Sequence, residues 1–156
     1  MATLGEKPAD RWLQVGGRLL IVAVLVVSII DKRGFVVSAL WISGTALLVA
    51  GLSLNIVARI YLGRFYSEAV RIRPDHRLIR NGPYRFVRHP IYLSVILFSL
   101  SAPIILGSLY GFIVSLALIP MLLHRIRIEE KYLISKFGRE YIEYAYKTRK
   151  LIPYIY

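Results

Sequence analysis

Hydrophobic positions along the chain form four apolar stretches, separated by short polar or strongly charged segments. The first two run from about 12 to 30 and from about 35 to 58. Each is close to the roughly 20 residues that an α-helix needs to cross about 30 Å of hydrocarbon. These two stretches therefore predict membrane-spanning helices.

The third and fourth stretches, about 91–106 and about 109–123, are shorter than a full crossing. Their helices are expected to continue into the charged sequence beside them, because roughly 10 to 14 apolar residues can equally form a re-entrant or interfacial segment. The uncharged connection LGSLYG, residues 106–111, is short. It predicts an antiparallel helical hairpin, in which Pro103 and Pro120 are candidate kink sites.

The C-terminal segment 128–148 has a different pattern, with apolar side chains at intervals of four and three: Leu133, Phe137, Tyr141 and Tyr144. This spacing is typical of an amphipathic helix, here packed against the middle loop or the lipid headgroups. The predicted fold is an all-α integral membrane protein, a single domain over residues 1–156. It has about four transmembrane helices and a C-terminal amphipathic helix.

Composition and charge predict how the chain is oriented in the membrane. The chain is 56% apolar with a net charge of +12, and membrane-length apolar stretches exclude a soluble nucleic-acid binder. Eight arginines lie between residues 59 and 88 and eight basic residues between 125 and 150, against two in the loop after the first span. The positive-inside rule places loop 59–90, the tail and both termini in the cytoplasm, and most of these arginines, Arg59 included, are interpreted as topology determinants.

Candidate chemistry gathers at two points, residues 75–92 entering the third stretch and residues 124–130 leaving the fourth. A hairpin brings the two points to one membrane face, where ionisable groups are expensive and usually functional. His89-Pro90 is typical of a helix start whose amides are free to bind an anion. Arg125 and Glu129, four residues apart, present a guanidinium and a carboxylate on one helix face. Such a site suits a zwitterionic ligand.

These residues carry a family resemblance over about the C-terminal half. The sequences HRLIRNGPYRFVRHPIY (76–92) and RIRIEEKYLISKFGREYIEYAYKTRKLIP (125–153) resemble the isoprenylcysteine carboxyl methyltransferase family of membrane enzymes. The shared pattern is a Gly-x-Tyr turn, Arg-His-Pro-x-Tyr, paired glutamates, Phe-Gly and a Tyr-x-x-Tyr helix. The resemblance implies S-adenosylmethionine (SAM) as cofactor and S-adenosylhomocysteine as product.

The resemblance also implies residue roles. Arg125 falls where the family places a substrate-facing arginine, which makes it the catalytic candidate. The cofactor-binding candidates are His76, Arg77, Leu78, Ile79, Tyr84, His89, Pro90, Ile91, Tyr92 and Glu129. The chain has no cysteine and no His-Glu-x-x-His spacing, so no metal site is expected.

The predicted function is carboxyl methylation of a lipophilic or lipid-anchored acceptor, at a cytoplasmic site in contact with membrane lipids. No nucleic acid and no obligate protein partner are expected. An N- or S-methyltransferase for phospholipids or small molecules stays open; it would need a base, for which His89, His124 and Glu130 are candidates. A sterol-type NADPH-dependent membrane reductase and a non-catalytic membrane adaptor are the alternatives from other classes.

Overall fold

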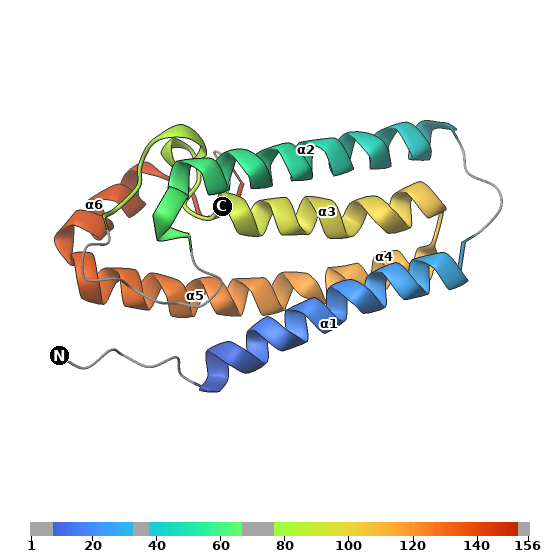
Figure 1. The fold of residues 1–156 in the computed structure, drawn as a ribbon, viewed down its shortest axis with the longest axis horizontal. Coiled ribbons are helices and arrows are strands. Elements are labelled where there is room, and N and C mark those ends of the chain that lie inside the picture. The colour runs from blue at the N-terminus through green and yellow to red at the C-terminus, as the bar shows by residue number, and fades with distance from the viewer. Residues whose placement is uncertain (1–7, 33–37, 67–76, 153–156) are drawn as a thin grey trace.

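The computed structural model describes residues 8–32, 38–66 and 77–152, of which residues 8–11 and 38 are described by their backbone alone. They form six α-helices and two short 3-10 helices within these ranges (Figure 1). The α-helices are α1 (Pro8–Ile30), α2 (Ser38–Leu62), α3 (Pro90–Leu106), α4 (Leu109–Leu116), α5 (Leu118–Phe137) and α6 (Arg139–Lys147). The 3-10 helices are η1 (Gly63–Phe65) and η2 (Gly82–Arg85).

The long helices lie side by side as a bundle (Figure 1). Helix α2 packs along α3, and α1 crosses α4 and α5 and also touches α3. Three segments are long and apolar enough to cross a membrane, Trp12–Ile30, Ala39–Phe65 and Leu109–Phe137, and α3 is a shorter apolar helix. Large apolar side chains on the outside of α1 and α2 are well exposed, among them Trp12 at 76% and Ile60 at 70%. Such surfaces suit lipid rather than water.

The fourth apolar stretch agrees with the sequence expectation, with an interruption near the candidate kink site Pro120 and a helix that continues into the charged sequence, whereas the tail differs from it. The helix breaks at Ala117, between α4 and α5, because the ring of Pro120 clashes with the carbonyl of the residue four before it. Helix α5 then runs on to Phe137 without a stop at residue 123. The predicted tail helix 128–148 is divided at Gly138, whose φ of +52° ends α5, so α6 takes its own direction.

Glycines set the close packing of α2 on α3. A Cβ at Gly51 would lie 3.0 Å from the backbone nitrogen of Phe98 and 3.1 Å from the carbonyl oxygen of Ser94. One turn further along α2, Asn55 donates a hydrogen bond of 2.7 Å to the Ser94 hydroxyl. Small residues and interhelical hydrogen bonds are the usual means by which helices associate in lipid.

The tail closes over the loop that precedes α3. Val87 and Arg149 form an isolated parallel bridge, with the Arg88 amide donating to the Arg149 carbonyl at 2.7 Å. The buried Tyr144 of α6 donates a hydrogen bond of 2.7 Å to the carbonyl of Tyr84. Burial raises the pKa of Tyr144 to about 12, so its hydroxyl stays a donor at physiological pH. The described part of the loop and the tail are thus joined by hydrogen bonds at one end of the bundle.

Candidate functional site

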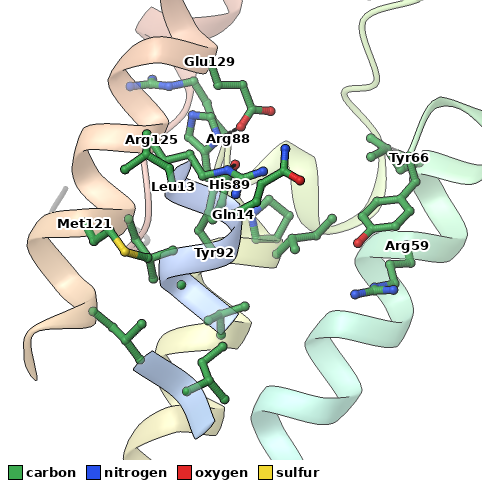
Figure 2. A pocket seen from close by; sticks show the side chains of 18 of the residues that line it. Leu13, Gln14, Arg59, Tyr66, Arg88, His89, Tyr92, Met121, Arg125 and Glu129 are labelled. Atoms are coloured by element: carbon green, nitrogen blue, oxygen red, sulfur yellow. Dashed lines mark hydrogen bonds and ion pairs between the residues drawn. The ribbon is translucent and has the colours of Figure 1, made fainter. Parts of the chain in front are cut away.

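A cavity of about 230 Å³ opens at this end of the bundle, between the beginnings of α1 and α3, the end of α2 and the middle of α5 (Figure 2). Polar and apolar side chains line it. The polar and aromatic ones are Gln14, Arg18, Arg59, Tyr66, Tyr84, Arg88, His89, Tyr92, Arg125 and Glu129. Arginine and glutamate side chains both reach the cavity, so it offers groups of both charges to a ligand.

The start of α3 contacts α5 at the side of the cavity. Arg125 donates a hydrogen bond of 3.0 Å from Nε to the Tyr92 hydroxyl, and its guanidinium carbon lies 5.9 Å from the centre of that ring. The rings of His89 and Tyr92 are 5.7 Å apart between centroids. The expected hairpin geometry is therefore present, with the Arg-His-Pro corner and the charged turn after the fourth apolar stretch forming adjoining walls of one cavity.

The paired glutamates point in different directions. Glu129 lies on the cavity wall with its side chain 31% exposed, and one carboxylate oxygen is 3.9 Å from His89 Nδ1. Glu130 is 14% exposed and turns toward Arg88, whose Nε is 2.9 Å from its carboxylate. Neighbouring residues on an α-helix lie about 100° apart around its axis. Only Glu129 can therefore reach a ligand in the cavity.

Arg88 is held by the protein itself, although it lines the cavity. Its Nη1 donates hydrogen bonds of 2.6 Å to the carbonyls of both Ala145 and Thr148, and its Nε pairs with Glu130. A guanidinium with these three acceptors connects the α3 corner, α5 and the tail. Its role is to position the corner.

The first turn of α3 offers polar groups to the cavity. Pro90 begins the helix and the Leu93 amide is the first to bond within it, to the His89 carbonyl, so Ile91 and Tyr92 have no intrahelical acceptor. His89 is 4% exposed, and its Nε2 lies 3.5 Å from the Glu130 carboxylate, on the side away from a ligand in the cavity. These amides can hold a carboxylate, and Glu129 can hold an ammonium. The residues therefore fit an amino acid-like ligand such as the methionine part of SAM.

Most of the predicted site residues meet here. Seven of them line the cavity: Tyr84, His89, Pro90, Ile91, Tyr92, Arg125 and Glu129. Arg77, Leu78 and Ile79 are not on the cavity wall; they precede η2 on the side where Arg80 pairs with Glu140 of α6 at 2.6 Å. His76 lies outside the described residues.

The sequence reasoning missed the walls that α1 and the end of α2 provide. Gln14 and Arg18 of α1 line the cavity, and so does Arg59, which stacks on Tyr66 with its guanidinium carbon 4.5 Å from the ring centre. Arg59 is thus more than a topology determinant. The signal for α1 was present, since Gln14 and Arg18 are polar residues four apart at the start of an apolar stretch, and so share a helix face.

A family model, curated sequences and a solved structure all relate this chain to the same family of proteins. The model of the isoprenylcysteine carboxyl methyltransferase (ICMT) family matches residues 44–135. The chain is 31% identical over 120 residues to protein-S-isoprenylcysteine O-methyltransferase B of Arabidopsis thaliana, covering 74% of this chain and 61% of that one. It is 33% identical over 124 residues to the corresponding enzyme of Schizosaccharomyces pombe, covering 78% and 52%.

The fold agrees with these sequence matches. A solved structure of a eukaryotic intramembrane Ras methyltransferase, ICMT, superposes with a TM-score of 0.75 at 29% identity, over 90% of this chain and 53% of that one. The chain thus spans about half to three fifths of the length of these relatives. The shared fold and the apolar helices confirm the predicted all-α integral membrane protein. The chain belongs to the isoprenylcysteine carboxyl methyltransferase family.

Proposed function

We propose that the protein transfers a methyl group from SAM to the carboxylate of a lipophilic or lipid-anchored acceptor. The observation that carries the proposal is one cavity in which Glu129, the start of α3 and Arg125 face each other beside an apolar wall from α1 and α5. Relatives named protein-S-isoprenylcysteine O-methyltransferase support carboxyl O-methylation over the N-, S-methyltransferase and reductase alternatives.

SAM would supply a methyl group activated by its sulfonium. Glu129 would bind its ammonium, the amides of Ile91 and Tyr92 its carboxylate, and the rings of Tyr84 and Tyr92 its flat or cationic parts. His76 stays a predicted contact. S-adenosylhomocysteine, the product, keeps the same amino acid part and is expected to bind through the same residues.

Arg125 is the proposed substrate-orienting residue. Its Nε is occupied by the Tyr92 hydroxyl, and this fixes the plane of the guanidinium. A carboxylate acceptor is already ionised near pH 7, so no base is needed and the task is alignment and exclusion of water. Tyr92 therefore acts as a positioning residue for Arg125.

The proposal includes an orientation of the site relative to the membrane. The cavity lies at the end of the bundle that carries the basic loop and tail, which the positive-inside rule places in the cytoplasm with both termini. SAM would enter from the cytoplasm, and the acceptor from the bilayer between the apolar helices. Membrane lipids are the expected surroundings of the site.

The test compares Glu129→Gln with Glu143→Gln, an exposed glutamate of α6, in purified protein. Isothermal calorimetry in detergent is expected to show SAM affinity at least about tenfold weaker for Glu129→Gln, because a charge-assisted hydrogen bond contributes about 1.5–3 kcal/mol. Glu143→Gln should bind as wild type. Equal SAM affinity in all three proteins would contradict the site.

Arg125→Ala separates binding from turnover. It is expected to keep SAM affinity and to lower the rate of methyl transfer to an S-isoprenylcysteine. The methylated product should release its label in base, as an ester does. A base-stable product would identify amine or thiol methylation instead.

A further inference from the structure

The cavity has an apolar end as well as a polar one. Helices α1 and α5 supply its wall: Gly17, Ile21, Leu118, Met121 and Leu122. This wall is the edge of a closely packed core. Val24 and Leu118 are 1% exposed and Leu122 is 5% exposed, and Ile21 and Met121 pack against them. A chain-like group that enters this end therefore meets a floor and has a maximum size.

Gly17 lies directly opposite Met121. A Cβ at Gly17 would be 2.8 Å from Met121 Cε, the tip of a flexible side chain that reaches from α5 toward α1 (Figure 2). Gly17 is inside α1, and glycine in a helix interior destabilises it by about 0.5–1 kcal/mol relative to alanine. Its backbone conformation is helical, so conformational freedom is not the reason for a glycine here. The missing side chain gives the tip of Met121 a place against the backbone of α1 at the cavity wall.

A side chain at residue 17 would push the thioether away from α1. Methionine adapts its shape easily, so the protein can accommodate this change at little cost in stability. The displaced atoms would take up room at the apolar end of the cavity. Gly16, the preceding residue, provides an internal comparison, because a Cβ there has no atom within 4 Å and the residue does not line the cavity.

We propose that Gly17 and Met121 determine the size of the apolar group that the acceptor may carry. The occupant is the hydrocarbon chain of an anionic amphiphile, with its carboxylate at Arg125 and its chain along α1. The order of residues along α5 supports this direction, since Arg125 and Glu129 lie about one and two helical turns beyond Met121 on the cavity wall. The inference rests on the proposed function for the carboxylate end. It adds a specificity determinant in α1, outside the residues that the family model matches.

The experiment measures binding and turnover of S-prenyl-cysteines of increasing chain length, in phosphatidylcholine nanodiscs. The variants are Gly17→Ala and Gly17→Leu, with Gly16→Ala and Gly16→Leu as controls. Gly17→Leu is expected to weaken binding of the longest acceptor by about tenfold or more, the effect of a methylene or two in an apolar pocket, and to leave the shortest unchanged. Gly17→Ala should show a smaller shift in the same direction, and Met121→Ala the opposite preference.

Thermal unfolding and SAM affinity are measured on every variant, so a folding defect is recognised. A loss at Gly17→Leu that is equal for all chain lengths, or equal to that of Gly16→Leu, would overturn the inference. Binding that depends on chain length without any methyl transfer would support the inference and contradict the proposed reaction. Methyl transfer with no chain-length difference between the Gly17 and Gly16 variants would support the proposed reaction and contradict the inference about acceptor size.

Discussion

Glu130 lies among three cationic or protonatable groups, and this surrounding explains why it is unavailable to a ligand. Its carboxylate is 2.9 Å from Arg88 Nε, 3.3 Å from Lys150 Nζ and 3.5 Å from His89 Nε2. The side chain is 14% exposed, so the interactions are only weakly screened. This single carboxylate joins the α3 corner, α5 and the tail.

Glu130→Gln is therefore expected to lower the free energy of unfolding by roughly 2–4 kcal/mol, since it leaves a partly buried guanidinium without its counter-charge. The matched control is Glu140→Gln, whose partner Arg80 is 42% exposed; an exposed pair contributes less than about 1 kcal/mol. Denaturant unfolding in detergent, followed by circular dichroism, measures both. Equal losses in the two variants would show that Glu130 is an ordinary surface residue.

Among the elements, α2 and α3 depend on contact between their backbones. Gly51 faces the Phe98 nitrogen and the Ser94 carbonyl, and Gly44 faces Ile105, whose backbone nitrogen would be 2.9 Å from a Cβ there. Backbone atoms cannot move aside as a side-chain tip can. The two helices would have to separate to admit a methyl group.

Gly51→Ala is expected to destabilise the protein by about 1–3 kcal/mol, the usual cost of overpacking, despite the better helix propensity of alanine. Gly16→Ala gains the propensity without a clash and should be neutral or stabilising by up to about 1 kcal/mol. Thermal unfolding of the two variants in the same detergent measures the difference. A stabilising Gly51→Ala would mean that α2 and α3 are less tightly packed than the structure shows.

For the whole molecule, closure of the tail over the loop depends on buried phenols. Burial raises the pKa of Tyr144 to about 12, and it also raises the pKa values of Tyr84 and Tyr141. In the unfolded chain these groups ionise near pH 10. Because the folded pKa is the higher one, their contribution is fully present below pH 10 and is lost as the pH rises toward 12.

The tail is accordingly expected to detach from the loop above about pH 10. Phenolate absorbance should rise in the same pH interval in which tail cleavage by an added protease accelerates. Tyr144→Phe removes one of the ionising groups and should make this interval less steep. Tail cleavage that is independent of pH up to 12 would contradict the role of these buried tyrosines in holding the tail on the loop.

The site was only partly predictable from residues and motifs. The Arg-His-Pro corner and Arg125 were found because a proline helix start and a charged helix turn are local patterns. Arg77, Leu78 and Ile79 were assigned through family position and do not line the cavity. Arg59 was interpreted as a topology determinant and the contacts of Arg88 were not predicted, because a guanidinium looks the same in sequence whether it meets carbonyls, an aromatic ring or lipid.

By itself, the sequence determined the apolar helices, the hairpin at LGSLYG and the collection of polar groups at one end. These depend on hydrophobicity, on proline and on chain connectivity, all of which act over short distances along the chain. Only the tertiary structure decided that Glu129 faces the cavity while Glu130 holds the tail, and that α1 forms the cavity wall opposite Met121. Those outcomes depend on which helix packs against which face, and such contacts join residues far apart in the chain.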